Sequence, residues 1–223
     1  MQQRQPDGGG IKIFGRSYPT IENVEIYGNY ASPCGAGVSV EQRGFNQESV
    51  VFRNCVFRDN HAEVTGSGVD LLPGSAAVFE NSLFVGNLSN KGVDHISPKE
   101  GYNKENGSGA LTVFPGSRAQ VDHCTFTGNW NGVDDKGAGS TYTNSIFWKN
   151  NLGGGISPGP RYELDILEAS GVSSCFLGGN IDDLRGTIDS SKNVLQAPDP
   201  DFDPRYRPRT NDYADAGYRP VKN

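Results

Sequence analysis

The sequence has no long hydrophobic run, no excess of positive charge and almost no pattern typical of amphipathic helices. No stretch approaches the roughly 18 consecutive apolar residues of a transmembrane helix, so we expect no transmembrane segment. The net charge of −6 would repel the phosphates of a nucleic acid, so we expect no nucleic-acid partner. The 223 residues leave room for one ordinary domain or one long repetitive domain.

What the sequence does contain is an eight-residue pattern that recurs without gaps and closes on asparagine. Five clear copies close at Asn29, Asn60, Asn87, Asn129 and Asn150, and a weaker sixth closes at Asn180. Glycine-rich elements precede most copies, as at Gly35-Ala36-Gly37-Val38. Repeats at uneven intervals, each with turn residues before short apolar segments, indicate a solenoid whose coils differ in loop length.

Three columns of the repeat each keep one kind of side chain. A large apolar column consists of Ile26, Phe57, Phe84, Phe126, Phe147 and Leu177. A small column, two residues earlier, consists of Val24, Cys55, Ser82, Cys124, Ser145 and Cys175. A third, apolar column consists of Ile21, Phe52, Phe79, Val121, Tyr142 and Val172. The first two columns share one face of a strand, because side chains alternate between the two faces.

The third column lies three residues before the small one, which breaks the period of two and requires a corner between two strands. The residue at that corner is asparagine in four copies, as in Asn54 and Asn81. Asparagine tolerates the left-handed backbone region, and stacked asparagines could hydrogen-bond between coils. We therefore predict an all-β parallel β-helix of about six coils over residues 1–195, followed by an irregular C-terminal cap over 196–223.

The pairing of glycine elements with F-x-x-N elements, such as Phe57 to Asn60 and Phe84 to Asn87, resembles the right-handed parallel β-helix repeat of secreted bacterial proteins. The same elements mark polymorphic outer-membrane adhesins, and the tail from Pro198 to Pro204 is similar to the closing segment of many secreted β-helix proteins. The resemblance implies an extracellular or cell-surface location. The Gly-His-Gly and Arg-Ile-Lys elements of polygalacturonases and the Arg-x-Pro-x-x-Arg element of pectate lyases are absent.

The tripeptide Gly-Val-Asp occurs three times and ends at Asp70, Asp94 and Asp134, the last followed by Asp135. If each valine points inward, each aspartate points outward, and Asp70 and Asp134 share a column two levels apart, about 10 Å. Leu111 or Thr112 would fill the level between them. That separation is near the upper end of the range for an inverting glycosidase pair, so Asp70, Asp134 and Asp135 are candidate acid and base. The alternative is a well-formed strand start with a solvated carboxylate.

The long insertion between Asn87 and Gly107 is the second candidate site, because insertions in a solenoid often lie on the binding face. There His95 is a candidate general base, and Asp94, Lys99 and Tyr102 are candidate substrate ligands, as are Lys12 and Arg16 elsewhere in the chain. The alternative is a polar surface loop.

Asp199, Asp201 and Asp203 alternate with prolines and offer oxygen ligands for calcium, and a stiff extended cap is the alternative. No other cofactor is expected, and the histidines lack the spacing of a metal site. Cys55, Cys124 and Cys175 lie two levels apart in one column, too far for a disulfide, so we predict buried free thiols.

Two functions fit this sequence. One is an extracellular β-helix module that binds a polysaccharide or cell-surface glycan along its outward strand face, with cleavage by a lyase or hydrolase reaction left open. The other is a non-catalytic structural or adhesive scaffold that contacts partners end-on. Nothing resembling a cap precedes Gly8-Gly9-Gly10, so we expect the first coil to contact a preceding segment, another subunit or a copy of itself.

Overall fold

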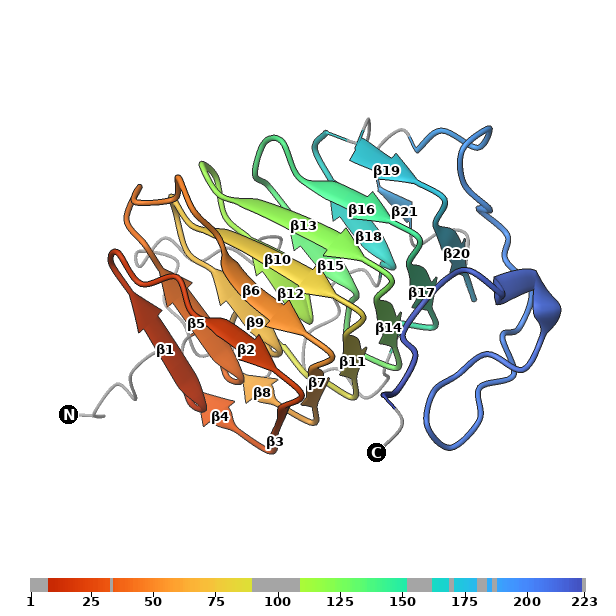
Figure 1. Cartoon of the computed structure of the whole chain (residues 1–223), viewed down its shortest axis with the longest axis horizontal. Coiled ribbons are helices and arrows are strands. Elements are labelled where there is room, and N and C mark those ends of the chain that lie inside the picture. Colours follow the sequence, from red (N-terminus) through yellow and green to blue (C-terminus); the bar gives the residue numbers. More distant parts are fainter. Residues whose placement is uncertain are drawn as a thin grey trace.

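A computed structural model of the chain describes residues 8–32, 34–89, 109–151, 162–168, 171–179, 184–185 and 188–221. The chain winds in successive coils about one axis, and strands from neighbouring coils lie side by side (Figure 1). The described part of the chain contains no helix with the length and apolar character needed to span a bilayer.

Three parallel sheets form the walls of the coils. Sheet A consists of β1 (Ile11–Phe14), β5 (Val38–Glu41), β9 (Val69–Leu71), β12 (Leu111–Val113), β15 (Val133–Asp135), β18 (Leu164–Ile166) and β21 (Leu184–Arg185). Sheet B consists of β2 (Thr20–Glu22), β6 (Val50–Arg53), β10 (Ala76–Glu80), β13 (Arg118–Asp122), β16 (Thr141–Thr143) and β19 (Val172–Ser173). Sheet C consists of β3 (Glu25–Tyr27), β7 (Val56–Arg58), β11 (Leu83–Val85), β14 (Thr125–Thr127), β17 (Ile146–Trp148) and β20 (Phe176–Gly178).

A short fourth pair joins β4 (Tyr30–Ala31) to β8 (His61–Ala62), and one 3-10 turn, η5 (Asn211–Tyr213), lies in the tail. The predicted parallel β-helix is confirmed, because each strand pairs with its equivalent one coil away instead of with its sequence neighbour.

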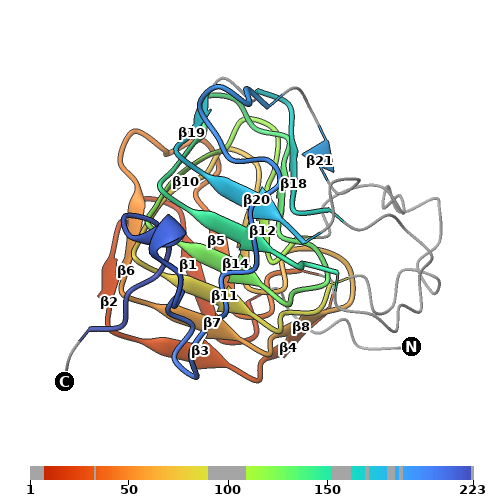
Figure 2. The ribbon, with the colours of Figure 1, turned by 90° about the vertical axis from the view of Figure 1, so that its right-hand side faces the viewer.

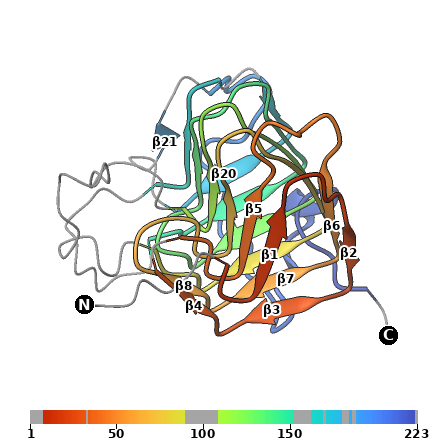
Figure 3. The same ribbon diagram turned by 90° about the vertical axis from the view of Figure 1, so that its left-hand side faces the viewer.

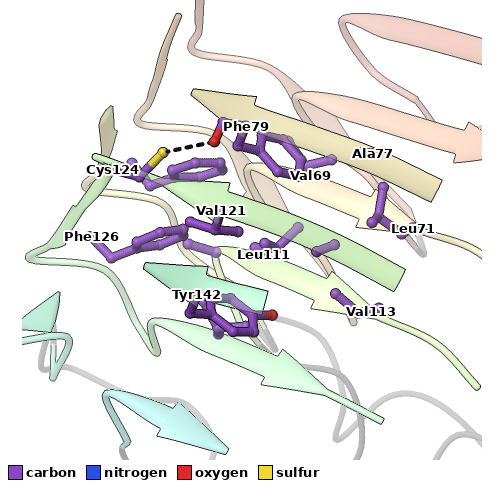
Figure 4. Close-up of a cluster of buried hydrophobic side chains, with 14 of the residues drawn as sticks. Val69, Leu71, Ala77, Phe79, Leu111, Val113, Val121, Cys124, Phe126 and Tyr142 are labelled. Carbon is purple, nitrogen blue, oxygen red and sulfur yellow. Dashed lines mark hydrogen bonds between the residues drawn. The ribbon is translucent and has the colours of Figure 1, made fainter. Parts of the chain in front are cut away.

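The interior is filled by the columns that the repeat predicts. Phe57, Phe84, Phe126 and Phe147 stack with ring centroids 4.5, 4.3 and 5.0 Å apart, and all four are fully buried. The Phe79–Val121–Tyr142 column of sheet B packs against this stack, as Figure 4 shows. Because each aromatic ring covers the next, the core is a continuous ladder along the axis.

The corner between sheets B and C has the predicted left-handed backbone. The φ angles are 57° at Asn23, 53° at Asn54, 44° at Asn81 and 49° at Asn144. The side chains are linked between coils as predicted, since Nδ2 of Asn81 donates to Oδ1 of Asn54 at 2.7 Å. Asparagine therefore both turns the backbone and ties one coil to the next.

The thiol prediction is also confirmed. Cys55, Cys124 and Cys175 are free and buried, with serines between them in the column. The backbone N–H of Cys124 donates to Oγ of Ser145 at 3.1 Å, and the Cys124 thiol donates to the Phe79 carbonyl of the preceding coil at 3.5 Å, so the small column also links the coils. Burial raises the pKa of Cys175 to about 12 and raises that of Cys124 further, which makes these thiols unreactive.

The C-terminal segment follows the last coil and then covers one side of the molecule. Val194 pairs with Phe176 of β20, which adds a further level to sheet C. The tail then turns back along the outward face of sheet C, as Figure 2 shows. Gly217 donates its N–H to the Asn144 carbonyl, Tyr218 to Oγ1 of Thr125 and Arg219 to Oδ1 of Asn81. The predicted cap thus crosses several coils toward the N-terminal end.

Candidate functional site

The outward row of sheet A contains the carboxylates singled out from the sequence. Ser39, Asp70, Thr112, Asp134 and Asp165 occupy successive positions in register. The predicted common column is confirmed, with Thr112 between Asp70 and Asp134, which places their Cα atoms about 10 Å apart. The repeat therefore does align acidic side chains on the face opposite to the core.

These carboxylates are not solvated, contrary to the expectation from the repeat. Asp70 and Asp134 are both fully buried. The glycine-rich turn before β9 folds back over the strand, so closely that a Cβ atom at Gly66 would lie 2.4 Å from Cγ of Asp70. Thr65 on the same turn donates its hydroxyl to Asp70 at 2.8 Å. The glycine is needed because the turn packs directly on the outward carboxylate.

Asp135 does not belong to the outward row, which corrects its assignment as a partner of Asp134. Its register with Val113 and Ile166 places it among the inward residues, because consecutive residues of a strand point to opposite faces. Its carboxylate accepts hydrogen bonds from the Tyr142 hydroxyl at 2.7 Å and from the Gly137 N–H at 2.8 Å. Burial raises the pKa of Asp135 despite these hydrogen bonds.

The sequence did not reveal that Asp165 continues the row or that Lys136 and Tyr162 contact its carboxylates. Nζ of Lys136 lies 3.2 Å from Oδ1 of Asp134 and 2.8 Å from Oδ1 of Asp165. The Tyr162 hydroxyl donates to Asp134 at 3.1 Å. Burial by itself would lower the pKa of Lys136, but the two carboxylates outweigh burial and raise it. Asp165 shows the same apolar-Asp-apolar alternation but lacks the preceding Gly-Val, which hid it in the sequence.

The candidate substrate ligands are dispersed. Lys12 begins the same outward row and pairs with Glu41 at 2.9 Å. Arg16 lies in the turn after β1, where its guanidinium covers the Phe45 ring at 4.4 Å. The remaining candidates lie outside the described residues, namely Asp94, His95, Lys99 and Tyr102.

The three aspartates of the tail do not converge on one point. Asp203 accepts the backbone N–H groups of Arg205 and Arg207 and pairs with the Arg207 guanidinium at 2.6 Å. Asp199 faces Lys149 at 3.6 Å and Asp201 faces Arg209 at 3.5 Å. Within the described ranges, no group of three or more His, Cys, Asp or Glu side chains could hold a metal ion. The three carboxylates therefore pair with separate partners and organise the tail.

A groove of about 730 Å³ lies between the tail and the outward face of sheet C, and no sequence motif predicted it. Its sheet side carries Val24, Val56 and Leu83 from three successive coils. Its tail side carries Arg205, Tyr206 and Tyr218. Since these two sides are far apart in sequence, only the folding back of the tail creates the groove.

Charged and polar groups set the character of this groove. Arg58 and Glu25 line it and pair with each other at 2.8 Å, while the Arg58 guanidinium also covers the Tyr27 ring. Arg205 forms no ion pair among the described residues. Tyr206 holds a left-handed backbone with φ of 61°, and its N–H donates to the Asp203 carbonyl at 2.9 Å. The Asp203 hydrogen bonds thus fix the turn that presents Arg205 and Tyr206 to the groove.

A sequence model of the family described as "Right handed beta helix region" matches residues 3–97. No curated protein and no solved structure matches the chain significantly. The matched residues contain the first three coils. The strands of the later coils, as far as β21, pair in the same three parallel sheets. The described coils thus have the parallel β-helix fold, and over residues 3–97 the chain is similar to the right-handed β-helix family.

Proposed function

We propose that this protein is an extracellular β-helix module that binds a polysaccharide in the groove between its C-terminal tail and the outward face of sheet C. The observation that carries this proposal is the lining of the groove, which combines tyrosine rings, guanidinium groups and asparagine side chains over a concave surface. Aromatic faces pack on the apolar faces of sugars, and guanidinium and amide groups hydrogen-bond to hydroxyl or carboxylate oxygens.

The repeat of the coils supports a polymeric ligand. Glu25, Val56 and Leu83 occupy equivalent positions in three neighbouring coils, which are spaced about 4.8 Å apart, and all three line the groove. A surface with equivalent positions at regular spacing suits a ligand that is itself periodic and extended along the axis. Arg205 supplies a positive charge that no described carboxylate neutralises, which favours an acidic glycan over a neutral one.

Calorimetry with oligogalacturonate and with a neutral cello-oligosaccharide tests this proposal. We expect Tyr206→Ala and Arg205→Ala each to weaken oligogalacturonate binding by about tenfold or more, because each removes a central contact. Arg209→Ala is the matched control, since Arg209 faces Asp201 in the same tail and does not line the groove. No binding of either glycan to the wild-type chain, or equal losses in the control, would refute the proposal.

We assign no cleavage to the outward carboxylates, because a substrate must reach both groups of an acid-base pair and Asp70 and Asp134 are fully buried. The assay is release of reducing ends or unsaturated products from the same two glycans. We expect no release by the wild type. Release that Asp70→Asn or Asp134→Asn abolishes would instead establish an enzyme.

A non-catalytic scaffold that contacts partners end-on is the second candidate. It is favoured by β1, β2 and β3, which among the described residues are each the last member of their sheet on the N-terminal side. Such strand edges present backbone donors and acceptors that can pair with another chain.

A further inference from the structure

The turns that join sheet A to sheet B in the first two coils carry two arginines and two phenylalanines in contact. The Arg43 guanidinium, from the second coil, lies over the Phe14 ring of the first, 4.6 Å from its centroid. In the reverse sense, Arg16 of the first coil lies over the Phe45 ring of the second at 4.4 Å. These four residues, which we call the corner patch, therefore form two crossed cation–π pairs between neighbouring coils.

Hydrogen bonds hold the second turn in place under the corner patch. The Phe45 carbonyl accepts the Tyr18 hydroxyl at 2.8 Å, and the Phe45 N–H donates to the Gln42 carbonyl at 3.0 Å. Gln42 is itself fully buried, and its Oε1 accepts the Ala76 N–H at 2.7 Å. Because the turn is fixed by its own contacts, a ligand bound to the patch has little chain to order.

The corner patch combines exposed rings with positive charge that the chain does not neutralise. Phe14 is 49% exposed and Phe45 is 39% exposed, although an arginine already lies on each ring. Arg16 forms no ion pair among the described residues. Such a surface, half apolar and half cationic, differs from the ordinary polar rim of a protein.

The carboxylates near the corner patch do not balance its arginines. Glu41 lies 2.7 Å from Arg43 but also 2.9 Å from Lys12, so one carboxylate is shared by two cations. Glu48, on the same turn as Arg43, is exposed and forms no ion pair within the described ranges. The corner patch is therefore a positive area on a chain whose net charge is −6, which favours an anionic ligand here.

The corner patch lies on a different side of the coils from the groove. Figure 3 shows the turn from β1 to β2 on the upper side of the first coil and β3 along its lower side. In the first coil β2 separates Arg16 from Asn23 of the groove, and in the second coil β6 separates Phe45 from Asn54. A sugar unit that contacts the patch therefore cannot contact the groove.

We propose that the corner patch is a second site for an acidic glycan, in which Arg16 and Arg43 bind uronate carboxylates and the rings of Phe14 and Phe45 pack on sugar rings. A stacked guanidinium uses its face and leaves the N–H donors on its edge available for the two oxygens of a carboxylate. An acidic peptide offers carboxylates without a flat sugar face, and a neutral glycan offers that face without the charge. Only a uronate matches both halves of the surface.

Two sites on different sides would allow one protein to hold two polysaccharide chains. This consequence rests on the proposed function, because it needs the groove as the other site. Binding at the corner patch itself does not depend on the groove.

Calorimetry of the full chain with trigalacturonate tests the second site by its stoichiometry. We expect two molecules to bind each wild-type chain and one to bind Arg16→Ala/Arg43→Asn, with affinity at the patch weakened by at least about tenfold. Asparagine is chosen at Arg43 because the φ of 54° there lies in the left-handed region. Arg53→Ala is the matched control, since this exposed arginine faces Glu22 and Glu80 on sheet B and lines neither site.

Two further measurements test the chemistry of the ligand. Arg16→Lys/Arg43→Lys keeps both charges but removes the planar donors, so it should also lose the second molecule. Oligoglutamate should not displace trigalacturonate from the patch at equal carboxylate concentration. Equal displacement, or full binding by the lysine variant, would show that the patch recognises charge alone and would overturn the assignment to a uronate.

The groove variant Arg205→Ala distinguishes failure of this proposal from failure of the proposed function, with circular dichroism to confirm that each variant is folded. Two molecules bound to Arg16→Ala/Arg43→Asn, or one lost by Arg53→Ala, would overturn the second site and leave the groove standing. Binding that Arg205→Ala leaves intact and Arg16→Ala/Arg43→Asn abolishes would support the corner patch and refute the groove. A wild type that binds no trigalacturonate would overturn both.

Discussion

Asp135 and Asp122 are both hydrogen-bonded carboxyl groups, yet their pKa values move in opposite directions. Burial raises the pKa of Asp135, and its hydrogen bonds do not offset the lost hydration. Burial alone would also raise the pKa of Asp122, but hydrogen bonds from Thr143, His123 and Asn144 outweigh it and lower the pKa. Position in the coil decides this difference, since Asp135 lies in the core and Asp122 at the outward corner.

The raised pKa of Asp135 predicts a loss of stability as pH rises. The folded state holds this proton more tightly than the unfolded state, so the free energy of unfolding falls between the usual aspartate pKa and the raised one. Asp135→Asn should remove this slope and should be more stable than the wild type at neutral pH, because it cannot ionise in the core. Urea unfolding of both proteins from pH 3 to pH 8 measures how the free energy of unfolding depends on pH.

Asp122→Asn is the control for that series. The lowered pKa of Asp122 stabilises the folded state above the usual aspartate pKa, and this contribution is lost as pH falls through the lowered value. The two variants should therefore differ from the wild type in opposite directions with pH. A pH-independent difference for Asp135→Asn would show that its carboxyl group is not titrating abnormally.

At the scale of structural elements, the coils are joined by ladders of buried amides as well as by strand pairing. Oδ1 of Asn87 accepts from the N–H and Nδ2 of Asn60, and Nδ2 of Asn87 donates to the Phe57 carbonyl at 2.9 Å. The next coil repeats the pattern, since Asn87 donates to Oδ1 of Asn129 at 2.9 Å. The ladder ends where Asn150 donates to Glu163. Each amide satisfies backbone groups that a turn would otherwise leave buried and unpaired.

Removing one amide from the middle of this ladder should be costly. Asn87→Ala removes the acceptor of the buried Asn60 N–H and the amide donor to the Phe57 carbonyl, and we expect a loss of about 2 to 5 kcal/mol in the free energy of unfolding. Asn29→Ala, in the half-exposed first coil, should lose less than about 1 kcal/mol because water replaces the amide. Equal losses in urea unfolding would contradict the ladder account.

The shape of the whole molecule depends on the tail, which holds sheet C from outside. Tyr213 is fully buried against Phe176, and its hydroxyl donates to the Pro198 carbonyl. Ile146 and Trp148 point outward from sheet C and would be exposed without the tail. The tail thus gives sheet C a second apolar layer and forms one wall of the groove.

Loosening the tail should open the groove without unwinding the coils. Tyr213→Ala removes a buried aromatic side chain, a change that costs about 3 to 5 kcal/mol, and should speed tryptic cleavage at Arg205 and Arg209 by at least about tenfold. Asp212→Ala, at the exposed neighbouring position, is the control. Unchanged cleavage, or loss of the β-sheet circular dichroism signal, would show that the tail is not a separately docked layer.

The repeat pattern predicted only part of the candidate site. The alignment of Asp70 with Asp134 followed from counting residues between glycine turn and corner, because that spacing is nearly the same in both coils, with 13 residues from Gly68 to Asn81 and 12 from Gly132 to Asn144. Their burial did not follow, since it depends on how the turn at Gly66 packs over the strand. The assignment of Asp135 failed because the pair was taken from sequence adjacency, whereas adjacent strand residues face opposite sides.

The sequence alone determined the coils, since local spacing of apolar, small and asparagine residues sets strand, corner and register in every repeat. The stacking of Phe57, Phe84 and Phe126 and the free thiols follow directly from that periodicity. Tertiary structure alone decided where the non-repeating tail lies, and therefore where the groove is. A tail without a repeat carries no register of its own, and its position is fixed by contacts such as Tyr218 with Thr125 and Arg219 with Asn81, which join residues distant in the chain.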